Sequence, residues 1–317
     1  MNYRQIIAES WAYTQGNKKL IRWLGFFPAL FTTTVSMGTL LYQLFSFKKS
    51  YIFGDENGSF LHDVISFLST FVQEHLTLTM PLVVFLVIFL LIYLAFPTWA
   101  QAGAIQVIAR DKNGQKATIG SGLRYGASAY LPLIEYHALM KTFSFMFILV
   151  EMSFAVRYSL NLFLFLMPIF LLFLVVGLVM TLLFTYAGFY IVIDGESVFD
   201  SVRKSTSLVI TNWKHTFLIT ILMMIIGIRI VLQVILVFLV PVLIVVVTGY
   251  LSLVIAPSIS VIIGGVIGIA GLVVAAYING VVDIFSYTVW TFTFLKLTSE
   301  QEVSAREVFV DEIGERA

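Results

Sequence analysis

The chain has 317 residues, of which 59% are hydrophobic and only 12% are charged, and its mean hydropathy is +0.96. Soluble domains carry about 25% charged residues, so a chain this apolar cannot cover itself with polar surface in water. The net charge of +1 gives no global field for nucleic acid, and the absence of cysteine excludes disulfides, thiolate metal sites and cysteine nucleophiles.

Long apolar stretches recur along the chain, and most reach the roughly 20 residues that cross a bilayer. A transmembrane β-barrel would show short alternating segments instead. The sequence therefore predicts an all-α integral membrane protein with six transmembrane helices. These spans are expected at 20–45, 78–108, 138–156, 162–193, 217–247 and 259–295. The second, fourth and sixth are longer than needed, so they should tilt or project beyond the lipid.

Three stretches that precede the odd-numbered spans resemble one another. They read YRQIIAESWAYTQGNKKL from residue 3, IGSGLRYGASAYLPLIEY from residue 119 and VFDSVRKSTSLVITNWKH from residue 198. In register, Ser10, Gly126 and Ser205 coincide. Each stretch has an apolar stripe, which in the first consists of Tyr3, Ile6, Ile7 and Trp11. The pattern predicts cytoplasmic interfacial amphipathic helices whose small central residue packs closely against a neighbouring span.

The chain thus divides into three hairpins of two spans, each preceded by an interfacial helix. A single membrane domain is expected over 1–298, with repeat-like units 1–116, 117–194 and 195–298, followed by an acidic cytoplasmic tail over 299–317. The tail should be a short helix or disordered, and a docking peptide is the functional alternative.

The segment 46–75 is the one sizeable outer segment. Its start, KKSYIFGDENGS, is typical of a turn, and apolar residues then recur at helical spacing. We expect a short amphipathic helix on the outer surface, or alternatively a helix that binds a protein partner.

Lysine and arginine decide the orientation. With both termini in the cytoplasm, 15 of the 19 basic residues lie on the cytoplasmic side, and only Lys48, Lys49 and Arg157 lie on the other. Arg229 belongs to neither side. It interrupts the fifth span within GIRIVLQ, where a charge costs about 2.5 to 3.5 kcal/mol and should face protein or a water-filled cavity.

Asp283 is the predicted partner of Arg229. Arg229 lies 15 residues beyond Lys214 and Asp283 lies 13 before Lys296, so both are expected about 20 Å deep. Gln233 follows Arg229 by four residues and Asn279 precedes Asp283 by four, which predicts a two-rung polar ladder between antiparallel spans.

Glu151 is a shallower third member of this polar cluster. The cluster either fixes helix register, or binds a lipid headgroup or an ion or relays protons. A stripe of small residues in the sixth span predicts tight helix packing. It consists of Gly264, Gly268, Gly271 and Ala275.

No catalytic set, metal site or cofactor is predicted. On a continuous helix, the pair at His62 and Asp63 would lie roughly 17 Å or more from the pair at Glu74 and His75, too far for one ion. No nucleophile–base–acid set is recognisable, so the chain is not expected to be an enzyme.

The stretch GESVFDSVRKSTSLVITNWKHTF, from 195 to 217, resembles a broad bacterial and archaeal group of six-span proteins. This group includes the membrane domain of some glycerophosphoryl diester phosphodiesterases. The catalytic residues of the phosphodiesterase have no positions to map onto here, so its activity is not carried over. The resemblance implies a module of the cytoplasmic membrane that faces phospholipid.

Two functions are therefore expected. The first is a phospholipid-associated envelope module or scaffold, with membrane phospholipids as partners, protein partners through the tail or outer helix, and no nucleic acid. The second is a transporter or channel for an ion, small molecule or lipid that uses Arg229 and Asp283.

Overall fold

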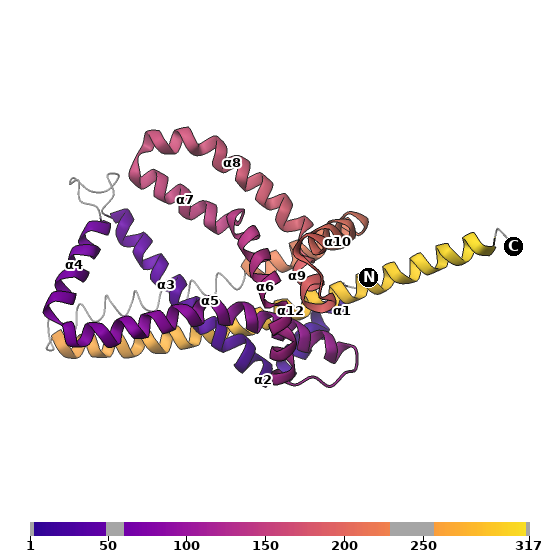
Figure 1. Cartoon of the computed structure of the whole chain (residues 1–317), viewed down its shortest axis with the longest axis horizontal. Helices are drawn as coiled ribbons and strands as arrows, with labels where there is room; N and C mark the ends of the chain where they lie inside the picture. The colour runs from indigo at the N-terminus through magenta and orange to yellow at the C-terminus, as the bar shows by residue number, and fades with distance from the viewer. Residues whose placement is uncertain (1–2, 49–59, 229–256, 315–317) are drawn as a thin grey trace. The chain divides into compact units, whose positions relative to one another are not determined.

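The structure, a computed structural model, describes residues 3–48, 60–228 and 257–314. Within these residues all regular elements are helical and no strand occurs, which confirms the predicted all-α class for this part of the chain (Figure 1). The first elements are α1 (Tyr3–Gly16), α2 (Lys18–Leu20), η1 (Ile21–Phe26), α3 (Phe27–Lys48), α4 (Phe60–Glu74) and α5 (Leu76–Lys112). Then follow α6 (Ile119–Thr142), α7 (Phe145–Tyr158), α8 (Leu160–Leu183), α9 (Ala187–Phe189), η2 (Tyr190–Asp194), α10 (Val198–Thr211), the helix Trp213–Ile228 and α12 (Pro257–Gly314).

Four described helices are long and apolar enough to cross a membrane. They are Lys18–Thr39, Leu76–Lys112, Leu160–Leu183 and Ile262–Glu300. The number rises to six if two bent pairs each count as one span. One pair joins Ile119–Thr142 to Phe147–Arg157 at 44°, and the other joins Val198–Thr211 to Trp213–Ile228 at 98°. The described residues therefore contain four to six candidate spans, which is compatible with a multi-pass membrane protein.

Two predicted spans are not continuous helices. The third span is divided, because α6 ends at Thr142 and α7 begins at Phe145. The fourth is broken after Leu183, and the chain resumes as α9 and the π-helix η2. The sixth agrees with the candidate span Ile262–Glu300, and α12 then continues without a break through the tail to Gly314. A helix, α4, is present where the amphipathic helix was predicted.

Two compact units divide the chain. Unit 1 comprises Met1–Leu30, Trp99–Leu133 and Leu182–Ala317, and unit 2 comprises Phe31–Thr98 and Ile134–Thr181. The first two predicted repeats therefore each contribute to both units.

Unit 2 contains the segments that are most exposed and most apolar. In α5 the side chains from Leu82 to Leu94 are largely exposed, as are most of those in α8. Its described contacts are mainly aromatic: Phe31 lies 5.3 Å from Phe89 between ring centroids, and the Arg157 guanidinium lies 5.7 Å from the Tyr42 ring centre. Exposed apolar helices of this kind are compatible with lipid contact.

The core of unit 1 forms where three helical segments meet. They are the C-terminal part of α5 from Ala100 to Ala109, the stretch Tyr186–Val192, and α12 from Ile284 to Leu297. The Gln106 side-chain amide donates to the Val192 carbonyl, which joins α5 to η2. The rings of Tyr190 and Phe294 meet edge to face at 4.8 Å, which joins η2 to α12. Side-chain packing of these three segments builds the platform on which α1, α6 and α10 lie.

Candidate functional site

The helix α6 packs closely against α5 at glycine residues. A Cβ on Gly126 would lie 2.7 Å from the Gly103 nitrogen, and one on Gly122 would overlap the Val107 side chain. The four-residue spacing of Gly122 and Gly126 places both on one face of α6. The prediction of close packing by a small central residue is confirmed at Gly126.

The helix α10 packs against the break between α8 and α9. The Ser205 hydroxyl donates to the Leu183 carbonyl at 2.8 Å and accepts from the Tyr186 amide at 3.1 Å. A side chain that enters a helical hydrogen-bond ladder in this way breaks the helix while satisfying its freed groups. Ser205 thus confirms the close-packing prediction and explains why the predicted fourth span is not continuous.

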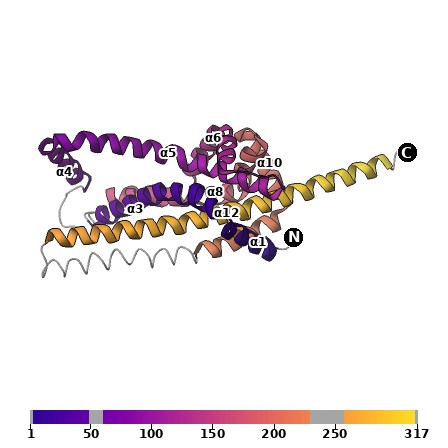
Figure 2. The ribbon, with the colours of Figure 1, turned by 90° about the horizontal axis from the view of Figure 1, so that it is seen from below.

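The helix α1 packs along α12, as Figure 2 shows. Ser10 is fully buried, and two aromatic pairs flank it: Trp11 with Phe285 at 5.5 Å and Tyr13 with Phe292 at 5.8 Å between ring centroids. Burial of the Tyr13 phenol, with a smaller contribution from Asp111, raises its pKa above the ordinary value of 10.0. All three residues aligned in the sequence are therefore buried.

The three contacts follow one cyclic rule. In terms of the predicted repeats, α6 packs on the last span of the repeat before it, and so does α10. The helix α1, which begins the first predicted repeat, packs on α12, the last predicted span of the third. Each of the three helices therefore packs on a span of a different predicted repeat.

Polar contacts also join α1 and α6 to α5. Lys112 of α5 forms an ion pair with Glu9 of α1 at 3.0 Å, and its ammonium lies 4.3 Å above the Phe292 ring. Arg110 lies 3.7 Å above the Tyr125 ring of α6 and donates to the Gln106 side chain. The hydrogen bond from Lys112 lowers the pKa of Glu9.

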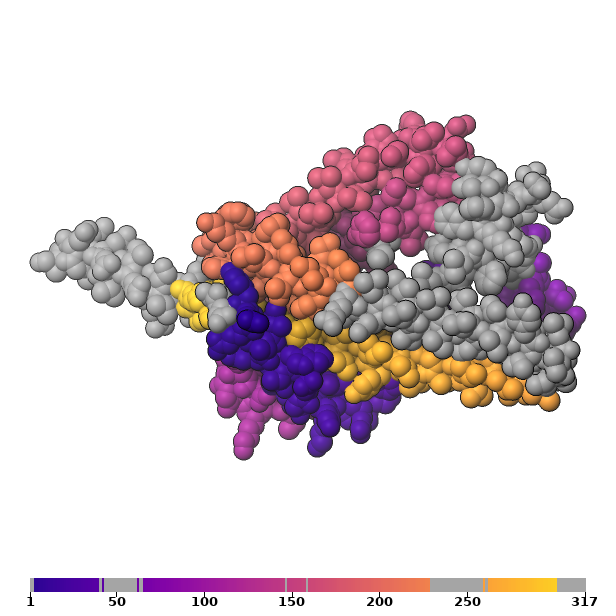
Figure 3. Space-filling model, turned by 180° about the vertical axis from the view of Figure 1, so that it is seen from behind, coloured from indigo at the N-terminus to yellow at the C-terminus, as the bar shows by residue number. Residues whose placement is uncertain are grey.

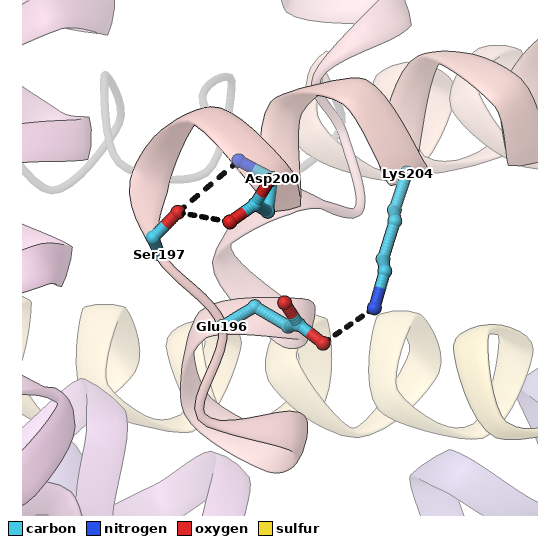
Figure 4. A network of polar contacts seen from close by, with 4 residues as sticks. All are labelled: Glu196, Ser197, Asp200 and Lys204. Carbon is cyan, nitrogen blue, oxygen red and sulfur yellow. Dashed lines mark hydrogen bonds and ion pairs between the residues drawn. The ribbon is translucent and has the colours of Figure 1, made fainter.

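The loop from η2 into α10 is held by a compact polar network (Figure 4). Gly195 adopts φ 72°, and Ser197 then caps α10 by accepting from the Asp200 amide at 3.3 Å and donating to its carboxylate at 2.6 Å. Lys204, one turn further, is paired with Glu196. Caps of this kind stabilise a helix by about 1 kcal/mol.

The outward faces of these helices carry large apolar side chains. Phe199 of α10 is 85% exposed and Trp11 of α1 is 45% exposed. The prediction that Trp11 shares one face with Ile6 was wrong in part, because α1 buries Ile6, Ser10 and Thr14 and leaves Trp11 at the edge. Small side chains allow the closer approach of backbones, so they take the protein-facing side.

Two residues of the polar cluster predicted from the sequence, Arg229 and Gln233, lie outside the described residues. Asp283 and Asn279 both lie on α12 and are half-buried. Within the described residues Asp283 has no hydrogen-bond or ion-pair partner, while Glu151 is an exposed residue of α7 in unit 2. The predicted ladder stays a prediction.

The predicted small-residue stripe on α12 is a contact surface only in part, because Ala275 is buried whereas Gly268 and Gly271 are not in close contact. Around Gly268 and Gly271 a Cβ would meet no described atom within 4 Å. Instead Gly280 packs on η1, where a Cβ would lie 2.5 Å from the Phe26 nitrogen, and a Cβ on Gly25 would lie 2.5 Å from the Gly280 carbonyl. Isolated glycines on separate helices have no spacing signal, so this contact was missed.

Chemical groups that could hold a metal are not gathered in the described residues, where no cluster of three or more His, Asp or Glu occurs. The described part of the chain has a packed core, and outward faces that combine aromatic and basic side chains. Comparison of the chain with protein-family models, curated proteins and solved structures finds no match.

Proposed function

We propose that the protein is a multi-pass membrane protein that associates with phospholipids and acts as an envelope module or scaffold. It has six spans in three hairpins, each preceded by an interfacial helix on the cytoplasmic side. The single observation that carries the proposal is the two-sided character of α1, α6 and α10. Each buries small residues within unit 1 and exposes apolar and basic side chains on its outward side, including Phe199 and Arg203 on α10.

The bend after α10 supports this placement. Helix Trp213–Ile228 leaves α10 at 98°, so α10 lies along the membrane plane if the following helix crosses it. Amphipathic helices in this orientation place their apolar face at the boundary between headgroups and acyl chains, with Lys and Arg near anionic lipids. We infer a scaffold function because the exposed faces are suited to lipid.

A site-directed fluorophore tests the proposal. The chain has no cysteine, so Phe199→Cys can be labelled uniquely and reconstituted in liposomes that contain lipids spin-labelled near the headgroup. We expect strong quenching at Phe199 and weak quenching at Lys204→Cys, which lies about 140° around the same helix. Equal, weak quenching at both positions would show that the Phe199 face does not contact lipid, and would reject the proposal.

Asp283 favours a second candidate, transport of a proton or cation. It is a half-buried carboxyl in the candidate span Ile262–Glu300, without a partner among the described residues. Ionisable side chains within spans are functional candidates by default. Flux of protons or cations into proteoliposomes that Asp283→Asn abolishes at unchanged folded yield would support transport. Absence of flux in the parent protein would reject it.

A further inference from the structure

Each interfacial helix is followed by a short segment that leads into the next predicted span, here called a membrane entry. The three membrane entries occupy equivalent positions but differ in charge. With Ser10, Gly126 and Ser205 in register, residues 17–23 correspond to 133–139 and 212–218. The first entry contains three cations, Lys18, Lys19 and Arg22; the second contains none and one carboxylate, Glu135; the third contains only Lys214. If the cations served only as a general anchor to anionic lipid, all three entries should carry similar positive charge. The first entry is distinctive because it alone has three cations.

The cations of the first entry share the outer side of one short segment. In α2 and η1 the buried residues are Leu20, Ile21, Leu24 and Gly25, and the exposed ones are Lys18, Lys19, Arg22 and Trp23. Figure 3 shows the N-terminal part of the chain, in indigo, at the surface of the molecule. The segment therefore presents three charges and an indole together.

The three cations of the first entry form no ion pair with another described residue. Lys204 is paired with Glu196 and Lys112 with Glu9, but within the described residues Lys18, Lys19 and Arg22 have no hydrogen-bond or ion-pair partner. Their charges are therefore available to an anionic ligand.

Trp23 places an exposed aromatic ring beside the three cations. Its ring stacks on Phe27 at 5.2 Å and 21°, and it remains 52% exposed. Tryptophan concentrates at the headgroup level of membranes, and long basic side chains extend from there toward phosphate. A π-helical turn such as η1, which holds Arg22 and Trp23, often marks a functional site.

We propose that Lys18, Lys19 and Arg22, above Trp23, bind the headgroup of one lipid that carries two negative charges. The chemistry is that of phosphate, supplied either as one monoester or as two diesters in the same headgroup. A singly charged phosphodiester balances one of three neighbouring cations, whereas a doubly charged headgroup balances two and accepts more charge-assisted hydrogen bonds. This inference depends on the proposed phospholipid association and deepens it.

The test is lipid binding to the purified full-length protein in detergent, measured by native mass spectrometry. The probes are phosphatidic acid, cardiolipin, phosphatidylglycerol and phosphatidylcholine. We expect one tightly bound molecule of phosphatidic acid or cardiolipin, and weaker binding of the other two. The variant K18Q/K19Q/R22Q should bind on the order of 100-fold more weakly, at about fivefold per cation. The charge-preserving variant K18R/K19R should retain binding.

The matched control removes three exposed cations that lie outside the first entry and outside α1, α6 and α10, as K116Q/K214Q/K296Q, and should change the affinity less than twofold. Equal loss in both triple variants, or equal binding of phosphatidylglycerol and phosphatidic acid, would overturn the single site while leaving phospholipid association intact. Failure of the parent protein to retain any phospholipid would overturn both. Unfolding midpoints of all variants, measured in the same detergent, identify any that are misfolded, and K18Q/K19Q alone then replaces a misfolded triple variant.

Discussion

Gly122 and Gly126 leave no room for a side chain where α6 meets α5. Gly126→Ala should destabilise the protein by about 1 to 3 kcal/mol, because the new methyl group would lie 2.7 Å from the Gly103 nitrogen, and backbone cannot move aside as a side chain can. The midpoint of unfolding in detergent measures the effect.

Gly120→Ala is the matched control, since it lies on the same helix and its Cβ would meet no described atom within 4 Å. Alanine in an open helical position should be neutral or stabilising by up to about 1 kcal/mol. Equal destabilisation by both substitutions would contradict the close contact.

Ser205 is the other residue whose loss should be costly. Ser205→Ala removes one hydrogen bond to the Leu183 carbonyl and one from the Tyr186 amide, and it leaves both backbone groups buried without that partner. A loss of about 1 to 3 kcal/mol per unsatisfied group is expected, measured by the same unfolding assay. The exposed Ser207→Ala, on the same helix, should change stability by less than about 0.5 kcal/mol.

The register of Ser10, Gly126 and Ser205 was visible in the sequence because the three surrounding stretches share several residue types in order. The contact between Gly25 and Gly280 could not be predicted from the sequence. Neither glycine belongs to the repeated pattern, and the contact depends on how η1 packs against α12. Small residues at regular spacing were a misleading signal at Gly268 and Gly271, where spacing records only that a close approach is sterically allowed.

At the scale of elements, the ion pair between Glu9 and Lys112 couples α1 to α5. The pKa of Glu9 is lowered in the folded protein, so its contribution is present above the ordinary value of 4.5 and is lost as the pH falls through the lowered value. Both side chains are about 40% exposed, so the effect should be below about 1 kcal/mol.

Hydrogen exchange of the α1 amides should therefore accelerate slightly, relative to the intrinsic rate, as the pH is lowered below 4.5. In Glu9→Gln the acceleration should disappear, since the titrating group is gone. An unchanged pH dependence in that variant would assign the effect to another carboxylate.

Helix breaks were the least predictable elements. The apolar run from 162 to 193 is broken at residues 184–186. None of these three residues is proline or glycine, so the sequence at the break favours a continuous helix. The break arises from a side chain on α10, some twenty residues further along the chain, that supplies hydrogen bonds to the open ladder. Local sequence does not encode a partner that arrives through tertiary packing.

At the scale of the whole molecule, the proposed topology places α6 and α10 on the cytoplasmic side and α4 on the outer side. A membrane-impermeant maleimide added to intact cells should label Ser66→Cys on α4 and should not label Ser128→Cys on α6 or Ser207→Cys on α10. All three positions are exposed, and the chain has no natural cysteine. Permeabilisation should make all three reactive. Labelling of Ser128→Cys in intact cells would contradict the three-hairpin arrangement.

The unbroken course of α12 has a mechanical consequence. Its side chains from Ile284 to Leu297 are held in the core of unit 1. The 18 residues from Leu297 to Gly314 extend about 25 Å at 1.5 Å per residue. For a stiff rod of that length, a tilt of about 5° where the helix leaves the core moves the far end by about 2 Å. The C-terminal part of α12 is in this sense a lever, which magnifies small rearrangements of the core.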